Sequence, residues 1–201
     1  FGMDGKFTPE DFVEAINVDL ANNLGNLLNR TVSMIEKYYD GVVPNYEGDV
    51  TDLDKDLHEA ALKTIATYEI LSDDLKVTEA YASVMDLVSK ANKYIQDSAP
   101  WALAKDPSKK KELASCMNHL ANVIFLAGML LSPILVTKSA KIFDQLGVPS
   151  ELRNYESAKK FGIISGTTVE KGEQLFPRLN EAEEIEYIKG LMAAPKEKAV
   201  A

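Results

Sequence analysis

The sequence is poor in several residue types that define particular classes of protein. Cys116 is the only cysteine among 201 residues, which excludes a disulfide-stapled scaffold and suits a reducing, cytoplasmic setting. Lys and Arg number 22 against 31 Asp and Glu, so the chain, with a net charge of −9, lacks the positive excess of a general nucleic-acid coat protein. A hydrophobic content of 46% excludes disorder as the main state. The composition therefore indicates a folded domain, and it leaves room for a site that reads a few unpaired bases.

Sequence motifs for catalysis and metal binding are also missing. His58 and His119 have no partner histidine at a metal-ligand spacing, and there is no Glu-x-x-His pair of the di-iron type. We therefore expect no catalytic residue and no metal site. Cys116 lies in an apolar helical pattern and is expected to be a packed thiol. The glycines of residues 162–168 lack the spacing and the lysine of a phosphate-binding loop, so we assign them to turns.

Helical periodicity is the dominant positive signal. Thr8-Pro9-Glu10-Asp11 is typical of a helix start, and Gly41 suits the end of the same helix. Between them an apolar stripe recurs at helical spacing, formed by Phe12, Ile16, Leu20, Leu24, Leu28 and Ile35. This pattern predicts one long helix with a single buried face.

Further helices are predicted along the rest of the chain. They cover about residues 53–71, 77–95, 107–131 and 133–147. The helix over residues 77–95 is expected to carry Val77 on its inward face, and Pro100 interrupts the helical pattern after it. Residues 153–178 are expected to be irregular or short strand, and a capping box at Asn180 predicts a last short helix through Leu191. The fold class is therefore predicted as all-α, a helical bundle of about five helices with an irregular C-terminal segment and a short final helix.

The predicted organisation has three parts. Residues 1–150 form the bundle, residues 151–192 a C-terminal segment, and residues 193–201 a linker-like tail. The tail, together with a first residue that is not Met, predicts a piece of a longer protein.

The apolar stretch 120–136 contains Asn122 and Pro133, so we interpret it as a buried helix and its break, and we expect no membrane contact.

One face of the first helix is unusually rich in asparagine. Asn22, Asn23, Asn26 and Asn29 lie opposite the apolar stripe, although Asn costs about 0.6 kcal/mol relative to Ala in a helix. Asn26 and Arg30 are four residues apart and therefore neighbours, and an amide beside a guanidinium suits the hydrogen-bonding edges of bases. The alternative, which composition alone favours, is that the asparagines bond to neighbouring helices or loops.

Two further features bear on binding. Trp101, the only tryptophan, follows Pro100 in the helix break, where it either covers one end of the core or stacks on an unpaired base. Lys109, Lys110 and Lys111 open a helix whose dipole they oppose, which phosphate contacts would explain. An ordinary solvated charge run is the alternative for these lysines.

Several of these segments resemble the anticodon-binding domain of bacterial methionyl-tRNA synthetases. The Asn26-Leu27-Leu28-Asn29-Arg30 and Ala99-Pro100-Trp101 pieces, in that order, are the most specific parts of the resemblance. It extends over nearly the whole chain, through residues 4–7, 15–22, 24–30, 40–41, 92–95, 99–105 and 171–179. Gln174 stands where many relatives have proline, a local departure that leaves the base-reading positions intact.

The resemblance implies a role in reading the CAU anticodon of methionine tRNA. Asn26 and Arg30 match the base-reading residues of that family, and Pro100 with Trp101 matches its stacking pair. The family's catalytic motifs and zinc-binding cysteines are absent, so the chain resembles a fragment of the ligase without its catalytic domain. The resemblance implies that this fragment is inactive alone and holds no cofactor. The full enzyme would use ATP and Mg. Residues 151–192 would fold back toward that catalytic domain, and no DNA partner is expected. A helical protein-interaction scaffold is the alternative function.

Overall fold

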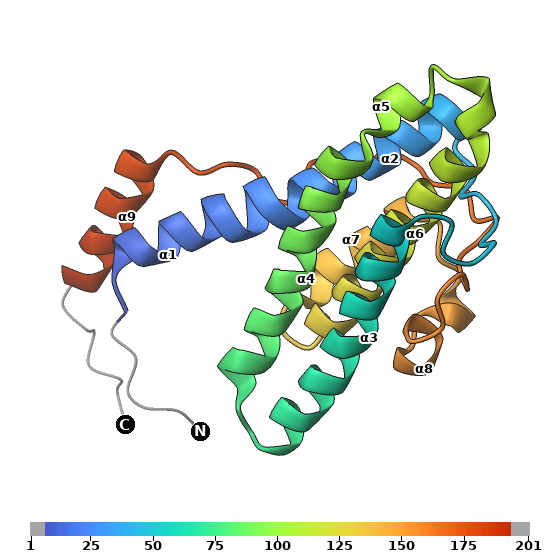
Figure 1. Cartoon of the computed structure of the whole chain (residues 1–201). Helices are drawn as coiled ribbons and strands as arrows, with labels where there is room; N and C mark the ends of the chain where they lie inside the picture. The colour runs from blue at the N-terminus through green and yellow to red at the C-terminus, as the bar shows by residue number, and fades with distance from the viewer. Residues whose placement is uncertain (1–6, 194–201) are drawn as a thin grey trace.

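Helices account for most of the structure, a computed structural model that describes residues 7–193 (Figure 1). The first long helix runs through α1 (Pro9–Ala15), the π-helical segment η1 (Ile16–Gly25) and α2 (Asn26–Tyr39). The chain then forms α3 (Asp52–Asp73), α4 (Val77–Ser98), α5 (Pro100–Leu103), η2 (Pro107–Lys109), α6 (Lys110–Leu131), α7 (Val136–Gln145), η3 (Ser150–Leu152), α8 (Tyr155–Ala158) and α9 (Glu181–Ala193). Within residues 7–193 the β-pairing is limited to a bridge between Val42 and Thr168, so the all-α prediction is confirmed.

Helix α6 forms the centre of the bundle. Nearly all of its residues from Leu113 to Leu131 are buried, and α2, α3, α4 and α7 pack around it. The Pro107–Leu131 stretch is long and apolar enough to cross a membrane by length and composition, but 89% of its most apolar window is buried within the protein. This burial agrees with the predicted core helix, and Cys116 is buried there as expected.

The apolar stripe predicted for the first helix is wrong near its start. Phe12 is 46% exposed and Ile16 is only partly buried, whereas Val13 and Asn17 are buried. This part of the helix projects beyond the bundle and packs against α9 (Figure 1), so a partner far away in the sequence selects its buried face. The π-helical bonding that begins at Ile16 also alters the turn on which a regular helical stripe depends.

Local signals set the other helix ends largely as predicted. Asp40 adopts a left-handed conformation after α2, and Gly41 follows it with a φ of 81°. Ala99 is also left-handed, which ends α4 and lets Pro100 open the short helix α5. The inward position predicted for Val77 is wrong, because this residue opens α4 at the tip of the α3–α4 hairpin and is 46% exposed.

The C-terminal segment is irregular and returns to the first helix. The side chain of Asn17 donates to the carbonyl of Leu179 at 3.1 Å and accepts from its backbone N–H at 2.8 Å. Helix α9 then lies along α1 (Figure 1). The final helix is therefore confirmed, with Ala193 as its last residue, and the rest of the predicted tail lies outside the described residues.

Candidate nucleic-acid interface

Asn26 and Arg30 line a groove between the first long helix and α4. The groove has a volume of about 500 Å³, and nine of its ten lining residues have polar side chains. One wall comes from η1 and α2 and the other from α4; together they present Val18, Asp19, Asn22, Asn23, Asn26, Arg30, Ser89, Asn92, Lys93 and Gln96. Amide groups predominate among these side chains, so the groove offers both donors and acceptors.

Part of the asparagine face holds the two walls together. The Asn92 amide donates to the side-chain oxygen of Asn23 at 2.7 Å and to its backbone carbonyl at 3.1 Å. Asn23 in turn donates to the Ser89 hydroxyl at 2.9 Å. The interpretation that the asparagines bond to a neighbouring helix is thus confirmed for Asn23. Asn26 and Asn29 are exposed, and their amides face solvent.

The guanidinium of Arg30 is oriented from the opposite wall. With the Gln96 amide turned so that its oxygen faces Arg30, that oxygen accepts from Nη1 at 3.2 Å and from Nη2 at 3.0 Å. Arg30 is partly buried and Asn26 is exposed one turn before it, so the guanidinium is held while the amide is free for a ligand.

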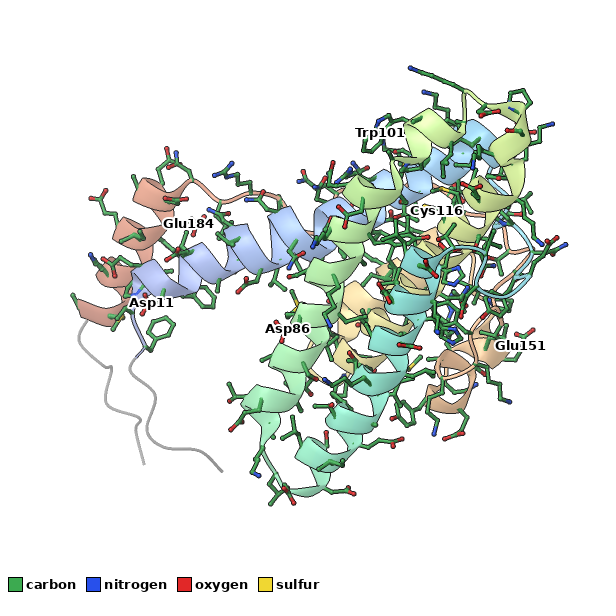
Figure 2. The ribbon with its side chains drawn as sticks, in the orientation of Figure 1. Asp11, Asp86, Trp101, Cys116, Glu151 and Glu184 are labelled. Atoms are coloured by element: carbon green, nitrogen blue, oxygen red, sulfur yellow. The ribbon has the colours of Figure 1, made fainter. Side chains whose placement is uncertain are left out.

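Trp101 lies on α5, just beyond the end of α4 (Figure 2). Its side chain is 43% exposed, whereas Pro100 is buried. The break at Ala99–Pro100 therefore presents the indole at the surface and anchors it through the proline. The indole is therefore exposed and not enclosed by the core.

Two of the three predicted lysines line a second hollow. Lys110 and Lys111 line a cavity of about 750 Å³ together with Lys37, and Leu103, the last residue of α5, lines it as well. Lys109 pairs with Glu112 at 2.6 Å, and Lys111 pairs with Glu47 at 3.6 Å. These exposed pairs are weakly held, which leaves the ammonium groups available to a stronger anion such as a phosphate.

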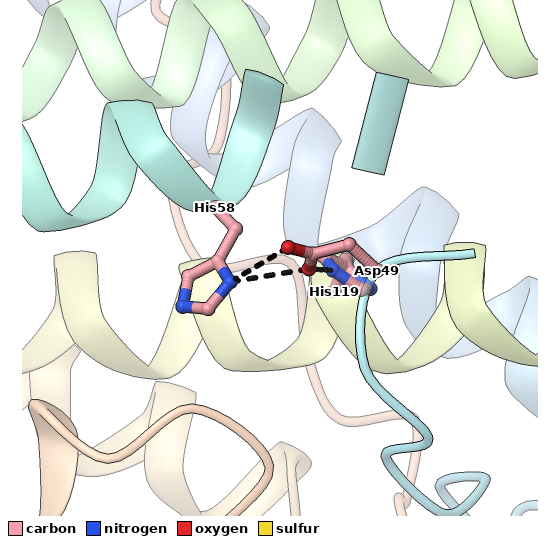
Figure 3. Close-up of side chains that lie close together, drawn as sticks. All are labelled: Asp49, His58 and His119. Carbon is pink, nitrogen blue, oxygen red and sulfur yellow. Dashed lines mark hydrogen bonds and ion pairs between the residues drawn. The ribbon is translucent and has the colours of Figure 1, made fainter. Parts of the chain in front are cut away.

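Sequence reasoning missed a cluster of titratable side chains in the same part of the bundle. Asp49 lies in the loop before α3, His58 on α3 and His119 on α6, and all three point toward one another (Figure 3). His119 Nε2 lies 2.9 Å from Asp49 Oδ1, and His58 Nδ1 lies 3.1 Å from the same oxygen. Partial burial opposes ionisation of Asp49, but hydrogen bonds from the two histidines outweigh it and lower the pKa of this carboxyl. No sequence signal joins residues 70 positions apart, so the cluster emerges only in the fold.

Known proteins share this architecture. The family model described as the anticodon binding domain of methionyl tRNA ligase matches residues 43–195. Over 96% of its own length the chain is 50% identical to the methionine–tRNA ligase of Bacillus subtilis, of which it covers 29%. Over 98% of its own length it is 48% identical to the methionine–tRNA ligase of Listeria monocytogenes, of which it covers 31%. The apo methionyl-tRNA synthetase of Mycobacterium tuberculosis superimposes with a TM-score of 0.83 at 30% identity, over 90% of this chain and 36% of that one.

The fold and these matches define a helical anticodon-binding domain. The chain belongs to the family of anticodon-binding domains of methionyl-tRNA ligase. It spans about 30% of the length of the curated relatives that it matches.

Proposed function

We propose that this domain reads the CAU anticodon of methionine tRNA on behalf of a methionine–tRNA ligase. The observation that carries the proposal is the groove that presents Asn26 and Arg30, whose opposite wall ends at Gln96 in the last turn of α4, shortly before the exposed Trp101 in the sequence. An unpaired base can stack on an indole and offer its edge to an amide and a guanidinium. The assignment of the first anticodon base to Asn26 and Arg30, and of stacking to Trp101 with Pro100, rests on the resemblance of these residues to the family.

The lysine-lined cavity would hold the backbone of the anticodon loop. Lys110 and Lys111 line the cavity beside Leu103 at the end of α5, and Lys109 immediately precedes them at the end of η2. A net charge of −9 leaves little general attraction for RNA, so phosphate contacts have to be concentrated there. These contacts position the loop, whereas the groove supplies base specificity.

The rest of the ligase would supply the chemistry. A catalytic domain would bind ATP and Mg, form the methionyl adenylate and transfer methionine to tRNA in the cytoplasm. Exposed apolar side chains on α1 and α9, namely Phe12, Tyr187, Leu191 and Met192, offer a face for that domain. The scaffold alternative is not favoured, because the family match and the polar groove have a common explanation in anticodon reading.

The experiment that tests the proposal separates the two steps of the full enzyme. Trp101→Ala is expected to lower the charging of methionine tRNA about 5- to 150-fold, the loss of one base stack, and to leave methionine-dependent ATP–pyrophosphate exchange unchanged. Asn29→Ala, an exposed position on α2 that lies outside the groove, is the control. Equal loss in both steps would contradict the assignment.

A further inference from the structure

The Asp49, His58 and His119 cluster has a feature that ordinary ion pairing does not require. Its three ligand atoms come from three separate elements, the loop before α3, α3 itself and α6, and all lie within 4.8 Å of one another. His119 is fully buried at 0% exposure. The cluster is independent of the groove and of the anticodon-binding proposal.

The hydrogen bonds around His119 fix which of its nitrogens carries a proton. The Ser115 hydroxyl donates its one proton to Asp54 at 2.7 Å, so it cannot donate to His119. Nδ1 of His119 must then be the donor, and it lies 2.8 Å from the carbonyl oxygen of Ser115. Nε2 is thereby turned toward Asp49 Oδ1, which lies 2.9 Å away.

The orientation of the His119 ring is the one that metal-binding histidines adopt. An Nδ1–H donated to a backbone carbonyl, with Nε2 free, is the arrangement in which protein histidines bind metals. His58 Nδ1 approaches the same carboxylate oxygen at 3.1 Å, so three possible ligand atoms converge on one point. Zinc bonds of about 2.1 Å in tetrahedral geometry place neighbouring ligand atoms about 3.4 Å apart. Both histidine nitrogens lie close to that spacing from Asp49 Oδ1, at 2.9 and 3.1 Å.

We propose that Asp49, His58 Nδ1 and His119 Nε2 form a site for a divalent transition-metal ion of the zinc type. Two imidazoles and one carboxylate are a donor set that suits zinc, with a fourth position open to water. The Asp49 and His58 side chains are 28% and 21% exposed, which gives the ion a path from solvent. The ring of Phe161 stacks on His58 with centroids 4.3 Å apart and closes one side of the site.

The ion would fasten the loop that precedes α3. This loop also carries Glu47, which pairs with Lys111 and lines the lysine-surrounded cavity. Tyr46 belongs to it as well, with its hydroxyl 3.3 Å from His58 Nδ1. The ion would therefore join this loop to α3 and α6.

Metal titration of the 201-residue chain tests the site. We expect one Zn²⁺ per chain by calorimetry, and a visible absorption spectrum of tetrahedral type on addition of Co²⁺. At zinc concentrations a hundred times the dissociation constant, Tm should rise by roughly 5–10 °C. His58→Gln and Asp49→Asn should each weaken zinc binding at least about tenfold. The control is Asp56→Asn, which removes an exposed carboxyl from α3, the helix of His58, and should leave zinc binding unchanged.

Three results would overturn the proposal. They are no saturable binding of Zn²⁺, a Co²⁺ spectrum indistinguishable from the hexaaqua ion, and equal affinity in the wild type and both ligand variants. The first two are read from the wild-type chain, so they do not depend on the folding of a variant. Far-ultraviolet circular dichroism of the variants in the absence of metal checks that the helices are retained.

Discussion

The Arg30 guanidinium on α2 is held by the Gln96 amide on α4, with Nη1 and Nη2 at 3.2 and 3.0 Å from the amide oxygen. The contact crosses the groove and joins its two walls next to the exposed Asn26. A long side chain that would otherwise sample many rotamers is thereby oriented before a ligand arrives. This preorganisation is what a residue that reads one base edge requires.

Removing the Gln96 contact should therefore weaken recognition without removing the reading group. Gln96→Ala is expected to reduce affinity for a CAU stem-loop by about 3- to 10-fold, the effect of losing the contact that orients Arg30. Gln96→Glu, which keeps an acceptor facing Arg30, should be closer to the wild type in its discrimination between anticodons. Fluorescence anisotropy with labelled stem-loops measures the affinity and the discrimination between anticodons for each variant. If Gln96→Ala binds as tightly as the wild type, the contact does not position Arg30.

The Asp54 network predicts acid-sensitive stability. Burial raises the pKa of Asp54, but hydrogen bonds from Tyr94 and Ser115 outweigh it, so the pKa is lowered in the native state. The stabilisation is fully present above the unfolded value of about 3.9 and is lost as the pH falls through the lower native pKa. Asp54→Asn should cost about 2–4 kcal/mol at neutral pH, with a smaller difference from the wild type at about pH 3.

Urea unfolding at several pH values measures that difference. Asp56→Asn, on the same helix and exposed, is the control and should be nearly neutral throughout. A difference between Asp54→Asn and the wild type that is constant from neutral to acid pH would contradict the lowered pKa.

Gly147 is predicted to be intolerant of any side chain. Its φ is 63°, and a Cβ there would lie 2.1 Å from the Thr168 carbonyl oxygen. Gly147→Ala combines left-handed strain with a backbone clash and should cost at least about 3 kcal/mol. Gly48→Ala is a matched control, because its φ of 82° carries similar strain with nothing within 4 Å, and it should cost about 1–2 kcal/mol. Similar Tm values for the two variants would show that the close approach to Thr168 is not retained.

Cys116 should be inert in the folded chain. Burial raises the pKa of its thiol to about 11, so little thiolate exists at neutral pH and reagents cannot reach it. A disulfide reagent is expected to react with the native protein at least a hundredfold more slowly than with the protein in denaturant, where one thiol per chain should titrate. Rapid reaction of the native chain would mean that α6 opens readily.

Features fixed by neighbouring residues were predictable, and features fixed by distant partners were not. The helix end near Gly41 and the break at Pro100 follow from local backbone preferences. The burial of Val13 in place of Phe12 depends on α9, which meets α1 only after the C-terminal segment has returned to it. Likewise, Asp49 and His119 meet only because the loop before α3 crosses α6.

The candidate interface divides in the same way. Asn26 and Arg30 are four residues apart on one helix, so their adjacency could be predicted from spacing. The opposite wall, with Asn92 and Gln96, depends on how α4 packs against η1, which the sequence pattern does not specify. The role of Asn23 as a link between the walls, rather than as a reading residue, emerges only from its bonds to Ser89 and Asn92.

The most direct measurement compares how the wild-type chain and Arg30→Ala bind two anticodon stem-loops that differ only in the first anticodon base. We predict that the wild type prefers the cytosine stem-loop by about 5- to 150-fold, the range of one good base-edge contact, and that Arg30→Ala loses most of this preference. Asn29→Ala should keep it. Equal binding of both stem-loops by the wild type, or an unchanged preference in Arg30→Ala, would contradict anticodon reading by this groove.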